Sequence, residues 1–163
     1  MSIDNYPSIK VEFTVGPSED YDLANYVDAD ELLDEIIERE GGDDWDITGY
    51  YNMPEPIEAL PDDIRVINCC FDYIDFVERC PWPQKVVDAL MEELSTPDAD
   101  DLRDFPIYGR YNSDVDFARS WLEDAGSLAE VPDSLRNHVD WQSWFDDSEF
   151  WEIGDTGYYT YSL

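Results

Sequence analysis

Hydrophobic and polar residues alternate over residues 8–16, with apolar side chains on one face as far as Val15. This period of two is typical of a half-buried β-strand. Over residues 28–40 the apolar residues recur at helical spacing behind an acidic N-cap, and Gly41-Gly42 ends the run. The chain therefore begins with a strand and an amphipathic helix, and residues 45–51 predict a second strand.

Two further helices are predicted in the middle of the chain. Apolar residues follow the helical period over residues 62–78, and Pro81-Trp82-Pro83 stops that helix. A second apolar stripe covers residues 86–94, before an acidic linker at residues 98–104. The pattern indicates a small helical centre.

The last third mixes helices with short strands. Residues 108–111 predict a short strand, followed by a helix that Asn112 or Ser113 caps and Gly126 terminates. Pro132 is placed to begin a short helix whose Leu135 faces the core, and residues 150–161 predict a closing β-hairpin.

These elements predict an α+β protein built as an elongated chain of small domains. Prolines and composition divide it into an α+β N-terminal domain at residues 1–61, a small helical central domain at 62–104 and an α+β C-terminal domain at 105–163.

The net charge of the chain is its most informative feature for function. The chain has 41 Asp and Glu against nine Lys and Arg, a formal net charge of -32, yet it is 43% hydrophobic and 15% aromatic. It is therefore built to fold, unlike a disordered acidic tail. The acids are spread among core-forming residues, and their mutual repulsion gives the fold no stability. The charge is expected to serve binding of something basic.

The charge density is comparable to that of DNA. B-form DNA carries one negative charge per roughly 1.7 Å, so a net charge of -32 at that density covers about 54 Å, or about 16 base pairs. A compact globule of this length has a radius of gyration of only about 15 Å. An elongated body fits the charge better.

Several function classes lack their sequence signals. The one histidine, His138, has no nucleophile signature around it, no cofactor-binding motif occurs, and a carboxylate pair chosen from so many acids has no specificity. Cys69, Cys70 and Cys80 are expected to be buried free thiols. We expect no enzyme, cofactor or metal site.

The same sequence bears on partners and location. With two lysines and seven arginines there is no basic stripe for direct nucleic-acid binding. No apolar run is long enough to span a membrane and the N-terminus has no signal-peptide pattern, so we expect a cytoplasmic protein.

Residues 117–141 resemble the ArdA antirestriction family. The matching features are Leu122-Glu123-Asp124 before Gly126, then Leu128, Glu130-Val131-Pro132, Leu135 and the pair Asp140-Trp141. Upstream, the strand, the acidic helix and Trp45-Asp-Ile47 match the family weakly, and the centre matches less. Packing alone would also favour Gly126, Leu128, Pro132 and Leu135, so these four are predicted to be structural.

The resemblance implies a DNA mimic that occupies the DNA-binding groove of type I restriction-modification enzymes. It also implies an elongated three-domain protomer that forms a homodimer through its C-terminal domain. The chain departs from the family after Asp140-Trp141, where Asp146-Asp147 replaces the usual Arg-Asp and makes the mimic more acidic.

The candidate partner-binding residues are distributed acids that would imitate phosphates, because solvent-facing acids have no packing role. In such a mimic no single carboxylate should dominate. The candidates are Glu31, Asp34, Glu35, Glu38, Asp43, Asp44, Asp72, Asp75, Glu92, Glu93, Asp114, Asp116, Glu123, Asp124, Glu130, Asp133, Asp146 and Asp147.

Three alternatives stay open. The mimic could be directed at another DNA-binding target, such as a nucleoid protein or a CRISPR effector. The chain could instead be a halophile's protein, acidic for solubility, which would lose structure at low ionic strength. It could also be an acidic adaptor anchored by exposed aromatics, which would lose affinity at one or two aromatic positions.

Overall fold

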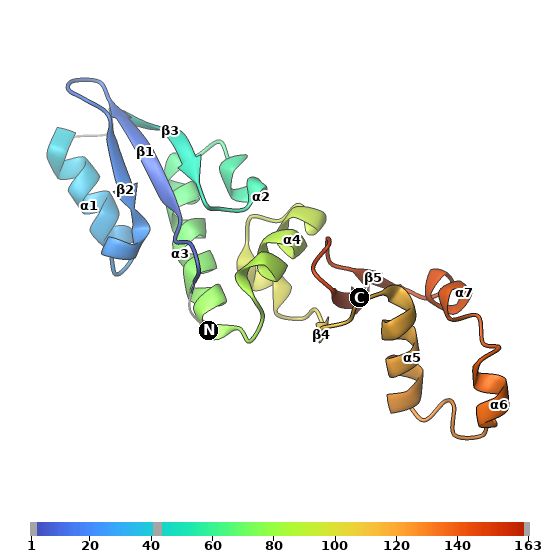
Figure 1. The fold of residues 1–163 in the computed structure, drawn as a ribbon. Helices are drawn as coiled ribbons and strands as arrows, with labels where there is room; N and C mark the ends of the chain where they lie inside the picture. Colours follow the sequence, from blue (N-terminus) through green and yellow to red (C-terminus); the bar gives the residue numbers. More distant parts are fainter. Residues whose placement is uncertain (1–2, 41–43, 162–163) are drawn as a thin grey trace. The chain divides into compact units, whose positions relative to one another are not determined.

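The structure is a computed structural model that describes residues 3–40 and 44–161. It has the predicted α+β fold class, with an N-terminal three-stranded sheet and helix, a helical middle, and a small C-terminal sheet with helices (Figure 1). The chain divides into two compact units, Met1–Arg103 and Asp104–Leu163. The predicted domain boundaries at residues 61 and 104 stay predictions, and the Gly41-Gly42 helix stop lies outside the described residues.

The first unit contains an antiparallel sheet in the order β2-β1-β3. Its strands are β1 (Ser8–Phe13), β2 (Glu19–Asp22) and β3 (Trp45–Tyr51). Ile9 pairs with a tyrosine on each neighbouring strand and is fully buried. Alternate side chains of β1 therefore enter the core, as the sequence period predicts.

Helices complete the first unit. They are the 3₁₀ turn η1 (Leu23–Asn25), α1 (Ala29–Glu40), α2 (Glu55–Glu58), α3 (Asp63–Arg79), α4 (Gln84–Leu94) and the 3₁₀ turn η2 (Ala99–Leu102). Helix α3 contacts α1, α2 and η2, and α4 contacts α2 and η2. Helix α3 contributes five fully buried side chains to the core of the unit: Val66, Ile67, Cys70, Tyr73 and Val77.

A buried polar network ties the N-terminal segment to α3 and α4. The Tyr73 hydroxyl donates to Asp88 Oδ1 at 2.5 Å and accepts from Gln84 Nε2 at 2.8 Å. Gln84 Oε1 accepts from the backbone N–H of Asp4 at 3.0 Å, and Gln84 Nε2 donates to the Asn5 carbonyl at 2.9 Å. Partial burial, with Glu92 nearby, raises the pKa of Asp88 to about 6 although the hydrogen bond from Tyr73 lowers it.

Asp88→Asn is expected to stabilise the protein at pH 7 but not at pH 4. Because the folded-state pKa lies above the ordinary value of 3.8, the stability that Asp88 contributes is fully present below about pH 4 and is lost as pH rises through about 6. Asparagine does not ionise and can still accept from Tyr73. The gain at pH 7, allowing for solvent screening, is on the order of 1–2 kcal/mol. Urea unfolding of the wild type and of Asp88→Asn at pH 4 and pH 7 measures the free energy of unfolding of each protein. The same difference between the two proteins at both pH values would contradict the prediction.

The second unit contains a small antiparallel sheet in the order β4-β6-β5. Its elements are β4 (Tyr108–Gly109), α5 (Asp114–Asp124), α6 (Asp133–Arg136), α7 (Trp141–Asp146), β5 (Phe150–Glu152) and β6 (Tyr158–Tyr161). Ser113 caps α5 by accepting from the Asp116 N–H at 3.1 Å. The predicted cap and closing hairpin are confirmed.

An aromatic cluster forms the core of the second unit. Phe117 is fully buried, and its ring stacks on Tyr159 at a centroid distance of 4.5 Å and meets Phe150 at 5.1 Å. Buried residues Ala118, Leu128, Trp141 and Phe145 complete the cluster. Such ring pairs add to the free energy that burial itself supplies.

Three sequence expectations about burial and linkers are wrong. The segment predicted as an acidic linker at residues 98–104 contains η2, whose Ala99 and Leu102 are fully buried against α3 and α4. Val15 is 76% exposed because β1 ends at Phe13. Leu135 is 54% exposed, because α6 is only one turn long and no residue of it is buried.

The three cysteines were expected to be free thiols, and this is confirmed. All three cysteines are free; Cys70 and Cys80 are buried, whereas Cys69 is half-buried. Burial raises the pKa of the Cys69 thiol, although Arg65 opposes this. These thiols are therefore packing groups rather than reactive ones.

Candidate partner-binding surface

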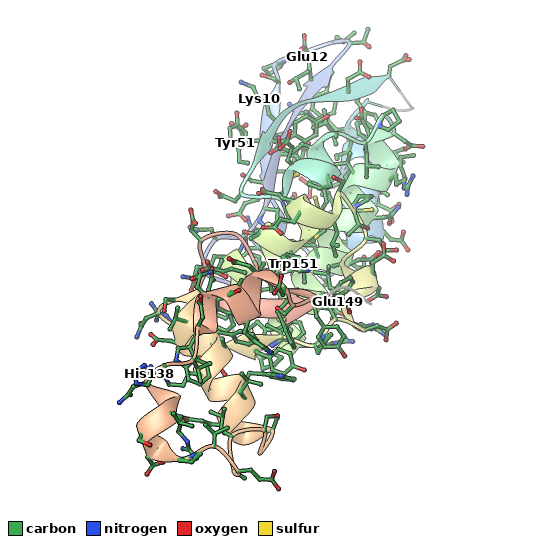
Figure 2. The ribbon with its side chains drawn as sticks, turned by 90° about the vertical axis from the view of Figure 1, so that its right-hand side faces the viewer. Lys10, Glu12, Tyr51, His138, Glu149 and Trp151 are labelled. Carbon is green, nitrogen blue, oxygen red and sulfur yellow. The ribbon has the colours of Figure 1, made fainter. Side chains whose placement is uncertain are left out.

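The predicted acids lie almost entirely on the surface. Asp43 is outside the described residues, and among the described candidates only Asp114 is not exposed. Figure 2 shows acidic side chains projecting outward from the ribbon, the labelled Glu12 and Glu149 among them. The acids thus give each unit a negatively charged exterior.

Helix α1 shows how the sequence produces this surface. Leu32 and Ile36 are fully buried, whereas Asp34, Glu35 and Glu38 are exposed. The buried residues are four apart and share one face of the helix, which leaves the acids on the opposite face. Amphipathic periodicity therefore fixes where the carboxylates point.

Each unit is acidic by itself. Met1–Arg103 carries 28 Asp and Glu against six Lys and Arg, a net charge of -22, and Asp104–Leu163 carries 13 against three, a net charge of -10. The negative potential is therefore a property of both units.

Ion pairs neutralise few of these acids. Among the described residues, the salt bridges join Arg39 to Glu19, Arg79 to Asp75 at 2.8 Å, Arg103 to Asp100 at 2.8 Å and Arg136 to Asp133 at 3.5 Å. Two of the predicted candidates, Asp75 and Asp133, take part in these four pairs. Exposed pairs of this kind contribute little to stability.

A separate group of acids caps helices. Asp22, Asp28, Asp62, Asp98 and Asp140 each accept a backbone N–H at a helix or 3₁₀ N-terminus. None of these is a predicted partner-binding residue, so capping and the predicted binding role fall mostly on different acids, although all five capping acids are also exposed.

Two candidates also have structural roles. Glu31 accepts from the Val27 N–H at 2.7 Å, while its own N–H donates to Asp28 at 2.9 Å, which completes a reciprocal cap at the start of α1. Asp114 accepts from the Tyr159 hydroxyl at 2.8 Å and is half-buried. Partial burial, followed by this hydrogen bond, raises the pKa of Tyr159.

Other candidates occupy positions that oppose folding. Glu92 and Glu93 lie in the last turn of α4, and Glu123 and Asp124 lie in the last turn of α5; neither turn contains a basic residue. The C-terminal end of a helix carries partial negative charge, so acids there are destabilising and bases are favoured. The helix dipole therefore does not favour these four acids.

Carboxylates crowd around Asp72 on α3. Partial burial, together with the charges of Asp98, Asp100 and Asp75, raises the pKa of Asp72. The neighbouring acids come from η2 and its cap as well as from α3 itself. Residues distant in sequence thus concentrate negative potential at one place.

Residues 117–141 span most of α5, the loop after it, the short helix α6 and the first residue of α7. Gly126 has the positive φ of +72° that a helix-terminating glycine requires, and Leu128 is buried. Pro132 precedes α6 directly, and Arg136 donates to the carbonyls of Leu128 at 2.9 Å and Val131 at 3.2 Å. The exposed candidates Glu123, Asp124, Glu130 and Asp133 lie in and around this segment.

The sequence analysis missed some surface acids. Glu12 and Asp46 are exposed and face each other as partners on β1 and β3, and Glu149 is exposed before β5. The polar positions of the alternating strand pattern could have identified Glu12. Arg136 was also missed, because nothing in the sequence shows which carbonyls a side chain will reach.

Two comparisons with known sequences were without a match. No protein-family model matches the chain, and no curated protein matches it significantly. The described residues contain no cluster of His, Cys, Asp and Glu that could hold a metal ion, and no described helix is long and apolar enough to cross a membrane.

Proposed function

We propose that this protein is a DNA mimic that inhibits type I restriction-modification enzymes by occupying their DNA-binding groove. It acts as a non-enzymatic homodimer in the cytoplasm, without a cofactor and without binding nucleic acid itself. Its carboxylates take the place of the phosphates that the enzyme's basic groove normally contacts.

The observation that carries the proposal is the placement of exposed acids where they do not serve the fold. Glu92, Glu123 and Asp124 are exposed in helix C-terminal turns without a base. A chain selected for stability alone would place Lys or Arg there. Their presence supports a role in binding a cationic surface.

The resemblance of residues 117–141 to the ArdA family supports the choice of target. The segment contains four of the candidate acids, Glu123, Asp124, Glu130 and Asp133, and all four are exposed. They can therefore contact a partner without unfolding the segment that carries the resemblance.

Mimicry of this kind depends on electrostatics more than on any single contact. Complementary potential raises the association rate and is screened by salt, while each exposed charge contributes a small amount. Many weak contacts together give the affinity, and the enzyme needs no chemistry from the inhibitor.

Displacement of DNA tests the proposal. Labelled duplex bound to a purified type I enzyme is titrated with this protein at low salt, and circular dichroism first verifies that the protein is folded there. Release of the duplex supports the proposal. Failure to release it by the folded protein would reject this target and favour another basic DNA-binding partner, whereas loss of structure at low salt would favour the halophile alternative.

A further inference from the structure

A groove of about 450 Å³ lies in the first unit between the η1 region and α3. It is separate from the helix C-terminal acids discussed above. Its walls are formed on one side by residues 23–28, with Tyr6, and on the other by residues 71–78 of α3. Segments nearly fifty residues apart in sequence therefore build it.

The exposed lining of the groove is more polar than apolar, but it also includes apolar and aromatic side chains. Among these lining residues Leu23 and Ile74 are buried, whereas Tyr26 and Phe71 are half-buried. Val27, at 87% exposure, is among the most exposed large apolar side chains of the described chain. Aromatic rings and exposed aliphatic groups at one place form a surface that a partner side chain can cover.

Carboxylates surround this lining, and no Lys or Arg lines the groove among the described residues. Asp28 caps α1, Asp75 pairs with Arg79, and Glu78 accepts from the Tyr6 hydroxyl at 2.6 Å. Asp72, the fourth acid, has its pKa raised by partial burial and by neighbouring carboxylates, so its negative charge is poorly compensated. A cation placed here would gain both charge pairing and ring contact.

We propose that this groove seats an arginine side chain of the basic protein partner. The inference rests on the proposed function, since it assumes a basic partner, and it adds a specific anchor to the distributed mimicry. Arginine fits better than lysine because its planar guanidinium stacks on aromatic rings while its fork of N–H donors bonds carboxylates. Phosphate imitation alone needs no aromatic side chains, so the groove recognises a side chain of the protein partner in addition to its positive charge.

Two peptides of equal charge test the groove in the full-length protein. Hexa-arginine and hexa-lysine are titrated into the protein by isothermal calorimetry, and amide spectra locate the contacts. General attraction to the acidic surface acts on both peptides. We expect hexa-arginine to bind about three- to tenfold more tightly, with the shifts concentrated in residues 23–28 and 71–78.

The variant Phe71→Leu with Asp72→Asn removes the ring and the poorly compensated charge while keeping most of the side-chain volume. It should lower the arginine preference at least threefold. Asp46→Asn is the matched control, because Asp46 is exposed on β3, at the opposite edge of the sheet from β2, and its loss changes the charge equally. The control should keep the preference.

The groove proposal is overturned if the folded double variant keeps the wild-type arginine preference, or if the shifts lie outside the groove. Single replacements Phe71→Leu and Asp72→Asn provide the same test if the double variant does not fold. These peptide experiments contain no restriction enzyme. A protein that prefers arginine in the groove yet fails to displace duplex DNA would refute the proposed target and leave the groove intact, and the reverse outcome would refute only the groove.

Discussion

Neutralising four exposed acids is expected to weaken binding to the type I enzyme by on the order of 100-fold without weakening the fold. The changes are Asp34→Asn and Glu38→Gln on α1, with Glu123→Gln and Asp124→Asn on α5. Each exposed charge contributes a factor of about two to five in affinity, and contributions from separated sites add as free energies. Each pair alone should therefore weaken binding about tenfold.

The same variants are expected to be as stable as the wild type or slightly more stable, although they bind the enzyme more weakly. Asp34 and Glu38 are four residues apart on one helix, where like charges repel. Glu123 and Asp124 oppose the dipole of α5 at its C-terminal end. Removing these charges should leave the melting temperature unchanged or raise it slightly.

The competition assay and a thermal melt measure the two effects together. Thr48→Ser with Ser134→Ala is the control, because both residues are exposed and every charge is retained. Unchanged affinity in the four-acid variant would contradict the mimic account. Loss of all affinity through a single aromatic replacement would favour the adaptor alternative.

Phe117→Ala is expected to destabilise the second unit by about 3–5 kcal/mol, a large part of a small domain's stability. Phe117 is fully buried, and its ring lies within 6.3 Å of the rings of Tyr108, Tyr111, Trp121, Phe145, Phe150 and Tyr159. Its removal leaves a cavity at the centre of the cluster and deletes several ring contacts at once.

Amide spectra distinguish loss of one unit from loss of both. Signals of residues 104–161 should collapse toward unfolded positions, whereas those of residues 3–103 should persist, because the buried core of that unit contains no residue of the aromatic cluster. Phe117→Leu retains most of the volume and should leave both units folded. Collapse of both sets of signals in Phe117→Ala would show that the units fold together.

Elements with strong periodicity were predictable from sequence. The apolar stripes of α1, α3, α4 and α5 and the alternation of β1 and β3 place buried or half-buried residues on one side of each element, so the predicted elements are present, although Ile37 of α1 is exposed. Strand β2 was not predicted because Glu19–Asp22 contributes one buried side chain, Tyr21, and is held mainly by pairing with β1. Helices α2 and α7 are four and six residues long, too short for a helical period to emerge.

Burial at single positions needed tertiary information. Leu135 fits a helical stripe by spacing, but α6 ends after one turn and has no face packed in the core. Ala99 and Leu102 sit among acids that suggested a linker, yet contacts with α3 and α4 bury them. Local sequence does not report which distant element will cover a residue.

The charged surface was predictable because acids on the polar face of an amphipathic element have to face solvent. The exposure of Asp34, Glu38, Glu92 and Glu123 follows from this rule. The groove between η1 and α3 was not predictable, since it depends on the fold bringing Tyr26 and Phe71 into the lining of one groove. The position of a surface charge follows from the local sequence pattern, whereas the position of a groove depends on which distant segments the fold brings together.

The central claim is that the enzyme accepts this protein in place of DNA, and mutually exclusive, salt-sensitive binding tests it most directly. Fluorescently labelled protein is bound to the purified type I enzyme at 50 and 200 mM salt, and unlabelled duplex is added at each concentration. The account predicts complete displacement by the duplex and an affinity at least about tenfold weaker at the higher salt. A complex that holds protein and duplex together, or an affinity that does not change with salt, would contradict it.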